Sequence, residues 1–187
     1  VGCGNGRLAH FLAEHLPKPI VYHGVDLSAD LLARARESLA TVDGLSVTLE
    51  ARDLVQNPPD SGTYDLVALM AVLHHIPARA QREALVRALA ARVSVGGLLV
   101  FSSWRFMDVP RLAARVVPFP DELAPHVEPG DYLLDWRRGT NALRYCHFID
   151  ADEQAALMQA SSLEVVAVFD ADGENGRLNG YSVLRRV

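Results

Sequence analysis

The feature that most constrains the fold is a regular alternation of strand-like and helix-like segments through the first hundred residues. Short apolar, β-rich runs predict four strands, at 20–25, 45–51, 64–70 and 98–103. Apolar residues at helical spacing predict helices that accompany them, at 7–16, 29–40 and 79–93. This order is typical of βαβ units, and it predicts an α/β fold whose largely parallel sheet is buried between two helix layers.

The alternation pauses between residues 104 and 146. This segment contains five prolines and is interpreted as a lid-like insertion. After it, residues 150–159 are expected to be helical, and strands at 163–170 and 180–186 flank a short turn. So short a connection favours antiparallel pairing, which we expect to add the last strand at an edge of the sheet. We expect residues 1–187 to form a single domain.

Composition excludes several classes of protein. No apolar run approaches the roughly 18 residues that a membrane span needs, so we expect no membrane association. The net charge of −5 argues against broad electrostatic capture of nucleic acid, and DNA is not an expected partner. Cys3 and Cys146 lack metal-ligand spacing and are interpreted as reduced thiols of a cytoplasmic protein. No metal site is predicted.

Glycines and carboxylates follow successive predicted strands. Gly2, Gly4 and Gly6 allow a tight turn and a close approach to a ligand, in front of a helix whose first N–H groups can receive a carboxylate. Asp26 follows the next strand, where it can accept hydrogen bonds from two ribose hydroxyls, and Asp53 follows the third, where it can accept one from an adenine amino group. Each feature by itself could be an ordinary turn or a capping acid. Together, at the carboxyl edge of one sheet, they predict a nucleoside-containing ligand.

These residues carry a resemblance to a known family. The Gly loop, Gly24-Val25-Asp26-Leu27-Ser28, Asp53-Leu54 and Tyr64-Asp65-Leu66-Val67 together resemble class I S-adenosylmethionine-dependent methyltransferases. The resemblance implies a doubly wound, Rossmann-like sheet of seven strands with an antiparallel last strand. It also implies that the family's first strand is truncated at the N-terminus, since only its end precedes the loop. The implied cofactor is S-adenosyl-L-methionine, held by Gly2, Cys3, Gly4, Asn5, Asp26, Leu27, Asp53, Leu54 and Ala71.

A narrower resemblance concerns the acceptor. The segments 71–76, 130–136 and 144–148 are similar to those of the wobble-uridine tRNA methyltransferases, which esterify a carboxymethyl group on an anticodon uridine. Asp135 and Cys146 depart from that family's pattern. The resemblance implies a tRNA acceptor, tRNA modification as the function and, from eukaryotic relatives, a possible small activator subunit. A small-molecule methyltransferase is the alternative, and a non-catalytic binding subunit of the same fold is a second one. A dehydrogenase is disfavoured by the glycine spacing.

A carboxylate acceptor suits the side chains in the insertion. With a pKa of about 4 it is already ionised, so methyl transfer needs alignment and cationic anchors more than a general base. The candidate catalytic residues are His74, Asp131 and Arg144, and the insertion is expected to form the acceptor site. The candidate substrate contacts are Arg105, Trp136, Arg137, Tyr145 and His147. The histidines could equally be core or capping residues, the arginines solvated charges and the aromatics part of a core.

Overall fold

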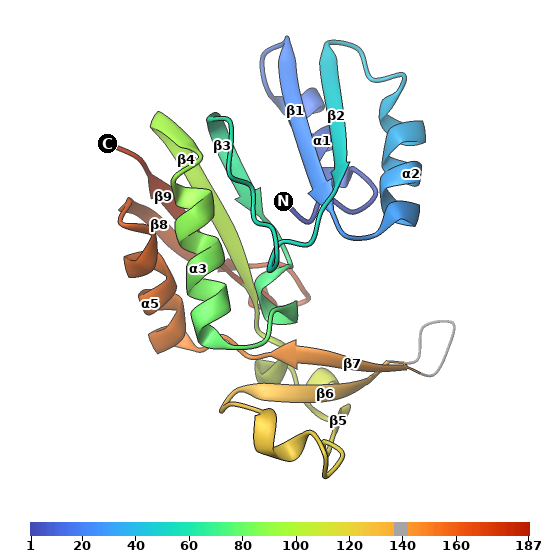
Figure 1. Ribbon diagram of the computed structural model, residues 1–187, viewed down its shortest axis with the longest axis vertical. Helices are drawn as coiled ribbons and strands as arrows, with labels where there is room; N and C mark the ends of the chain where they lie inside the picture. Colours follow the sequence, from blue (N-terminus) through green and yellow to red (C-terminus); the bar gives the residue numbers. More distant parts are fainter. Residues whose placement is uncertain (137–141) are drawn as a thin grey trace. The chain divides into compact units, whose positions relative to one another are not determined.

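The computed structural model describes residues 1–136 and 142–187, which divide into two compact units, Val1–Asp60 and Ser61–Val187 (Figure 1). Each unit is described by itself, and the single domain expected over residues 1–187 stays a prediction. No helix in the described part of the chain has both the length and the apolar character that spanning a membrane requires.

The first unit is a pair of parallel strands with two helices. Its elements are α1 (Arg7–His15), β1 (Ile20–Asp26), α2 (Ala29–Leu39) and β2 (Leu45–Ala51). The hydroxyl oxygen of Ser28 accepts a hydrogen bond from the Leu31 amide at 3.3 Å and caps α2 as its sequence position predicts. Ala9, Tyr22, Ala35 and Leu39 form the core between helices and strands. These elements lie where the alternation of the sequence predicts them.

The second unit is built on a four-stranded sheet in the order β3-β4-β9-β8. Its strands are β3 (Tyr64–Leu69), β4 (Val93–Trp104), β8 (Glu164–Ala171) and β9 (Asn179–Arg185). β3 and β4 are parallel, whereas β9 pairs antiparallel with both β4 and β8. The expectation that the last strand lies at an edge is wrong. β9 pairs with β8 through the hairpin on one side and with β4 on its other side. The largely exposed β8 therefore lies at the edge of the sheet.

Two helices cover one face of this sheet (Figure 1): α3 (Arg79–Ala90) and α5 (Ala151–Ser161). Leu85 and Leu89 of α3 and Leu157 of α5 are almost completely buried. A buried polar contact joins α5 to the sheet, because Gln154 Nε2 donates to Ser182 Oγ at 2.9 Å. The described strands form sheets of two, four and three strands, and the seven-stranded sheet implied by the family resemblance stays a prediction.

The insertion predicted at 104–146 contains a three-stranded antiparallel sheet, which lies toward the lower part of Figure 1. Its elements are η2 (Phe106–Asp108), α4 (Pro110–Ala113), β5 (Val116–Val117), η3 (Ala124–His126), β6 (Asp131–Trp136) and β7 (Ala142–His147). Phe106, Leu134 and Cys146 are fully buried and give it a core. A further short helix, η1 (Leu73–His75), follows β3.

Candidate functional site

The Gly loop is held against the end of β1. Gly2, Gly4 and Gly6 have φ values of 63°, 53° and 88°, in the left-handed region that glycine adopts without strain. The Cys3 amide donates to the Val25 carbonyl at 2.9 Å, and the Gly4 amide donates to Asp26 Oδ2 at 2.8 Å. A Cβ atom built on Gly4 meets nothing within 4 Å, so the loop presents an open backbone surface at this point.

Asp26 is oriented by the backbone on both of its oxygens. Besides Oδ2, which binds Gly4, its Oδ1 accepts from the Ser28 amide at 2.9 Å. A carboxylate offers about four lone-pair positions, so two remain for ligand hydroxyls. The structure therefore brings the Gly loop and Asp26 together, as a nucleoside site requires. The neighbouring Asn5 and Leu27 are exposed, and Leu27 is 71% exposed.

Asp53 follows β2 in a tight turn. Its Oδ1 accepts from the Val55 and Gln56 amides, at 2.8 and 3.2 Å. Its Oδ2 has no hydrogen-bond partner among the residues that the structure describes, and this oxygen is the one available to an adenine amino group. Leu54 is half-buried beside it. Cofactor contacts for Asp53 and Leu54 stay a prediction.

In the second unit, Ala71 and the two histidines follow β3. Ala71 has a φ of 56°, unusual for a residue with a Cβ atom, and its amide donates to Ser102 Oγ at 2.9 Å. The side chain of His74 is buried, and its Nδ1 makes no hydrogen bond to any described residue. Burial, together with His75 and Arg144, holds the pKa of His74 well below its usual value, so this imidazole is neutral.

His75 and Arg144 form a pair beside His74. The Arg144 guanidinium contacts His75 Nε2 at 2.5 Å and lies 5.8 Å from the ring centre of Trp104. His75 Nδ1 lies 3.4 Å from the Tyr145 carbonyl, so Nδ1 carries the proton and Nε2 accepts from Arg144. Burial and Arg144 lower the pKa of His75 to about 4. The structure thus brings two of the predicted catalytic residues, His74 and Arg144, close to the neutral imidazole of His75.

A largely buried group of ionisable side chains, which we call the Arg82 cluster, lies between α3, α5 and the three-stranded sheet β5-β6-β7, the small sheet. Its members are Arg82, Glu128, Asp131, His147 and Glu153. Arg82 is completely buried and donates to Glu153 Oε1 at 2.7 Å, to Glu128 Oε1 at 2.6 Å and to the Ile76 carbonyl at 2.8 Å. One side chain of α3 therefore holds α5, the approach to β6 and the end of η1.

His147 completes the cluster as an imidazolium. Its Nδ1 lies 2.7 Å from Asp131 Oδ1 and its Nε2 lies 2.6 Å from Glu153 Oε2. A neutral ring has one N–H only, so two such short contacts to carboxylates favour the protonated form, against the Arg82 Nη2 that lies 2.9 Å from Nε2. The carboxylates raise the pKa of His147 against the opposing effect of its burial. Against the effect of burial, hydrogen bonds from Tyr145, the Glu128 amide and His147 lower the pKa of Asp131. Hydrogen bonds from His147 and Arg82 likewise lower the pKa of Glu153.

The predicted acceptor residues Asp131, Tyr145 and His147 all belong to this arrangement or adjoin it. Asp131 Oδ1 also accepts from the Tyr145 hydroxyl at 2.6 Å, and its Oδ2 accepts from the Glu128 amide at 3.0 Å. Their polar atoms are therefore engaged with other protein groups. Catalytic and substrate roles for these three residues stay predictions.

The other predicted substrate residues are placed differently. Arg105 Nη2 donates to Gln154 Oε1 at 2.7 Å, and its guanidinium packs beneath Gly180, which ties the start of the insertion to α5 and β9. Arg137 and the side chain of Trp136 lie outside what the structure describes. We assign no metal site. Glu128, Asp131 and His147 have ligand-type atoms within 4.8 Å of one another, but Arg82 and Tyr145 already occupy them.

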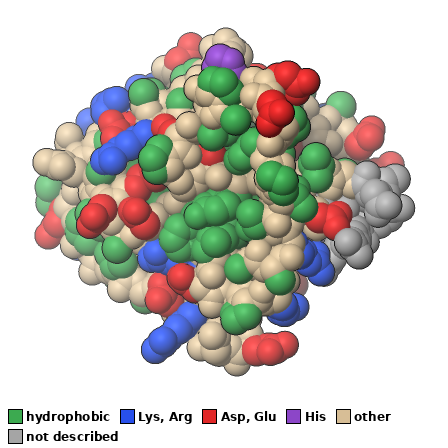
Figure 2. Space-filling view, turned by 90° about the horizontal axis from the view of Figure 1, so that it is seen from below, with side chains coloured by type: hydrophobic (Ala, Val, Ile, Leu, Met, Phe, Trp, Pro, Cys, Tyr) green, Lys and Arg blue, Asp and Glu red, His purple; other side chains and the backbone are tan. Residues whose placement is uncertain are grey.

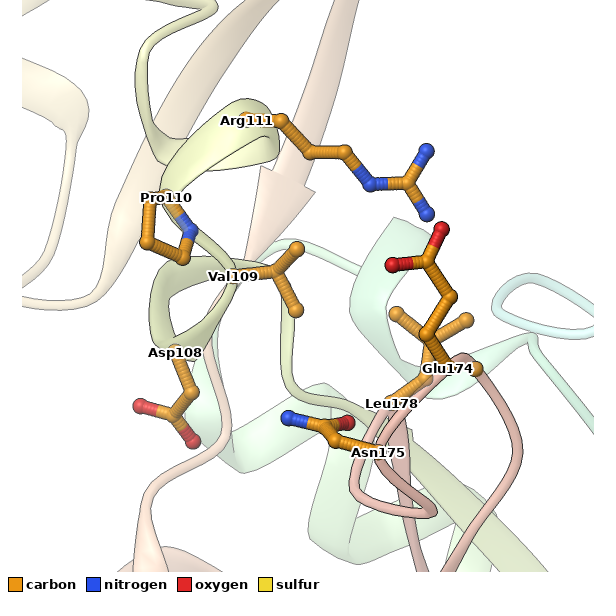
Figure 3. Close-up of a pocket in the computed structure, with 8 residues that line it drawn as sticks. Asp108, Val109, Pro110, Arg111, Glu174, Asn175 and Leu178 are labelled. Atoms are coloured by element: carbon orange, nitrogen blue, oxygen red, sulfur yellow. The ribbon is translucent and has the colours of Figure 1, made fainter.

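A hollow of about 330 Å³ opens between the insertion and the loop that joins β8 to β9 (Figure 3). In Figure 3 the Arg111 guanidinium and the Glu174 carboxylate extend toward one another across it. Its lining residues are Asp108, Val109, Pro110, Arg111, Gly173, Glu174, Asn175 and Leu178. These segments follow the carboxyl ends of β4 and β8, the edge at which sheets of this kind bind ligands. The hollow is at the small end of the range for ligand sites.

Sequence reasoning missed Arg82, Glu128 and Glu153 as a unit. One signal was available for Arg82. Arg82, Leu85, Val86 and Leu89 stand at i, i+3, i+4 and i+7, so the arginine occupies the apolar stripe of α3, and all four are buried. A charged residue at a core position predicts a buried partner of opposite charge.

Comparison with known proteins decides the family. A family model described as a methyltransferase domain matches residues 1–99, which is more than half of the chain and includes the Gly loop, Asp26 and Asp53. The chain belongs to this methyltransferase domain family. It is an S-adenosylmethionine-dependent methyltransferase, and S-adenosylmethionine is its cofactor. The open Gly4 surface and the oriented Asp26 carboxylate fit that cofactor's carboxylate and ribose ends.

Two curated relatives are small-molecule enzymes by name. Trans-aconitate 2-methyltransferase from Azoarcus sp. is 26% identical over 223 residues, which cover 100% of this chain and 84% of the relative. A ubiquinone biosynthesis O-methyltransferase from Burkholderia multivorans is 31% identical and is matched over 90% of this chain and 64% of its own length.

Solved structures share the fold. A SAM-dependent methyltransferase from Methanosarcina mazei superposes with a TM-score of 0.73 at 14% identity, covering 100% of this chain and 90% of the other. SAM-bound CalS10, an amino pentose methyltransferase from Micromonospora echinaspora, gives a TM-score of 0.65 at 21% identity, covering 100% and 81%. These matches support the Rossmann-like methyltransferase fold.

Proposed function

We propose that this methyltransferase esterifies the carboxylate of a small organic acid. The observation that carries the proposal is the similarity of the whole chain to a trans-aconitate 2-methyltransferase, of which it spans 84%. The hollow beside the insertion supports it, because about 330 Å³ suits a small acid.

The chemistry of the second unit suits an acceptor that is already ionised. A carboxylate acceptor has already lost its proton at neutral pH. Methyl transfer to it therefore requires a cationic anchor and alignment with the methyl group. Arg144 is the anchor that we propose, because its guanidinium lies beside the histidines that follow the carboxyl end of β3, the edge at which sheets of this kind bind ligands.

A carboxymethyl group on a tRNA wobble uridine is the second candidate, because it also presents a carboxylate and because segments 130–136 and 144–148 resemble the enzymes that methylate it. The net charge of −5 counts against tRNA binding by this chain without a basic partner. The face drawn in Figure 2 carries acidic and basic side chains intermixed around a group of hydrophobic ones, not a continuous basic surface.

The experiment is transfer of labelled methyl groups from S-adenosylmethionine to three acceptors: trans-aconitate with related di- and tricarboxylic acids, phenolic O-acceptors, and bulk tRNA. We expect base-labile methyl esters in the first set. Labelling of phenols with no acid labelled contradicts the carboxylate assignment, and labelling of tRNA with no small acid labelled favours the second candidate.

Arg144→Lys and Arg144→Ala test the anchor on whichever acid is labelled. Both are expected to lose most turnover while the affinity for S-adenosylhomocysteine stays within twofold, because a lysine cannot reproduce a bidentate guanidinium contact. Arg111→Ala, at an exposed arginine lining the hollow, tests the competing anchor, and Arg87→Ala, at an exposed arginine of α3, is the matched control. Full turnover in both Arg144 variants, with loss in Arg111→Ala, transfers the anchor to Arg111.

A further inference from the structure

The Arg82 cluster joins four segments of the second unit. Arg82 comes from α3 and Glu153 from the first turn of α5, whereas Glu128 and Asp131 flank the start of β6 and His147 ends β7. Through these contacts the small sheet is fastened to the helix pair by charge-assisted hydrogen bonds of 2.6 to 2.7 Å.

The same contacts reach the histidine turn. Arg82 Nη1 donates to the carbonyl of Ile76, the residue at which η1 ends, directly after His74 and His75. From the other side, Tyr145 donates its hydroxyl to Asp131 in the cluster and offers its carbonyl to His75 Nδ1. The cluster therefore fixes η1 both through α3 and through β7.

We propose that Arg82 and His147 are positioning residues, which hold the His74–His75 turn against β6 and β7, and that they do so only while His147 carries its proton. That this turn belongs to the acceptor site rests on the proposed function, whereas the contacts and their pH dependence do not. The arrangement makes the small sheet a part of the second unit that loosens as the pH rises.

The charges in the cluster give the reason. Among the residues that the structure describes, every charged or titratable side chain that faces His147 is an acid except Arg82. The acids are Asp131 from β6, Glu153 from α5 and Glu128 from the preceding loop, with Tyr145 of β7 bound to Asp131. With His147 protonated, two cations face three carboxylates. Loss of that proton leaves one cation against three carboxylates. It also turns Nε2, which lies 2.9 Å from Arg82 Nη2, into an acceptor that takes a hydrogen bond from Arg82 in place of donating to Glu153.

The direction of the pH effect follows from the raised pKa of His147. Its contribution to stability is fully present below about pH 6.5, the value of a free histidine, and is lost as the pH rises through the folded-state pKa. Asp131 and Glu153, whose pKa values are lowered, stay ionised throughout that range and do not offset the loss.

The test is amide hydrogen exchange on the full chain between pH 6 and pH 9, corrected for the intrinsic pH dependence of exchange. In the wild type we expect exchange at 71–76, 128–136 and 142–148 to rise at least tenfold across this range, with β1 and β2 unchanged. His147→Gln should exchange rapidly in these segments at every pH. His126→Gln, at an exposed histidine of the same insertion, is the matched control and should follow the wild type.

A corrected exchange profile of the wild type that is flat from pH 6 to pH 9 overturns the proposal, and this measurement needs neither a folded variant nor a known acceptor. A rise spread equally over all of the second unit also overturns it, because general destabilisation then replaces local loosening. Arg82→Lys separates positioning from bulk stability. It is expected to raise KM for the labelled acid at least fivefold with S-adenosylhomocysteine affinity within twofold, and an unchanged KM contradicts the role of Arg82.

Discussion

Gly4→Ala tests whether the open surface of the Gly loop is where the cofactor lies. Gly4 has a φ of 53°, and a Cβ atom at this position meets nothing within 4 Å. The added methyl group therefore clashes with no protein atom, and its cost to folding is backbone strain of about 1–2 kcal/mol. The reduced entropy of the unfolded chain offsets about 0.4–1 kcal/mol of that strain. The net loss in the free energy of unfolding should be about 1 kcal/mol.

Gly176→Ala is a matched control in the second unit. Gly176 has a φ of 69° and, like Gly4, no atom within 4 Å of the Cβ position. Strain and entropy are therefore nearly the same in the two variants, and urea unfolding should show losses that agree within about 0.5 kcal/mol. They should differ in ligand binding, because only at Gly4 does the methyl group point where we expect S-adenosylmethionine to approach the backbone.

Calorimetric titration with S-adenosylhomocysteine measures that difference. We expect Gly4→Ala to weaken binding by at least about tenfold, which corresponds to about 1.4 kcal/mol, and Gly176→Ala to leave it within twofold. Wild-type affinity in both variants would refute the reasoning, because a methyl group placed where the cofactor contacts the backbone must weaken binding. Equal weakening would refute it too, since the effect would then not be local to the loop.

Three further outcomes are expected. Asp26→Asn should weaken S-adenosylmethionine binding by about 1–3 kcal/mol in calorimetry, since an amide nitrogen cannot accept from the Gly4 amide or a ribose hydroxyl, whereas the exposed Asp30→Asn should not. The pKa of His75 is lowered to about 4, so below pH 6.5 the unfolded chain binds a proton that the folded chain does not bind, and the folded state loses stability. The fall in melting temperature from pH 7 to pH 5 should therefore be shallower in His75→Gln, and an equal slope would contradict that pKa. Phe106→Ala should cost about 3–5 kcal/mol in urea unfolding because Phe106 is fully buried, against a smaller loss for Phe169→Ala at a residue that is 48% exposed.

Local patterns predicted the elements well because they reflect local physics. The apolar runs and helix caps placed β1 to β3 and α1 to α3 within a few residues, and Ser28 caps α2 as its position suggests. β4 begins at Val93, five residues before its predicted start at 98, because the strand continues back through the glycines at 96 and 97. Strand order was harder, because periodicity does not specify which neighbour a strand takes. The position of β9 between β4 and β8 depends on the pairing of its second edge, which no pattern within 180–186 encodes.

The candidate site shows the same limit for side chains. The contact between Gly4 and Asp26 could be predicted, because both stand at ends of neighbouring elements where the family resemblance also places cofactor contacts. Residue type was a weaker guide for the insertion. The resemblance of the insertion to the wobble-uridine enzymes predicted Asp131 as catalytic and Tyr145 and His147 as substrate contacts. The structure engages their polar atoms with one another and with Arg82 and Glu153, and those roles stay predictions. Hydrogen bonds among these side chains can be recognised only from the three-dimensional structure.

The energetics of the Arg82 cluster separate its positioning role from any role in stability. Burying two cations and two carboxylates, with Glu128 partly exposed beside them, incurs a desolvation cost that their attraction roughly balances. Well-packed apolar side chains of similar volume often do as well or better. We therefore expect the cluster as a whole to contribute little to the free energy of unfolding. A variant with Arg82→Met, Glu128→Gln, His147→Leu and Glu153→Met keeps Asp131, whose carboxylate retains hydrogen bonds from Tyr145 and the Glu128 amide. It should therefore unfold within about 2 kcal/mol of the wild type, whereas Arg82→Met by itself should lose about 3–5 kcal/mol by leaving buried carboxylates without their arginine. The fourfold variant should also lose the rise in exchange of β6 and β7 between pH 6 and pH 9, since no group in it titrates there. A fourfold variant whose exchange still rises tenfold would place the pH dependence outside the cluster.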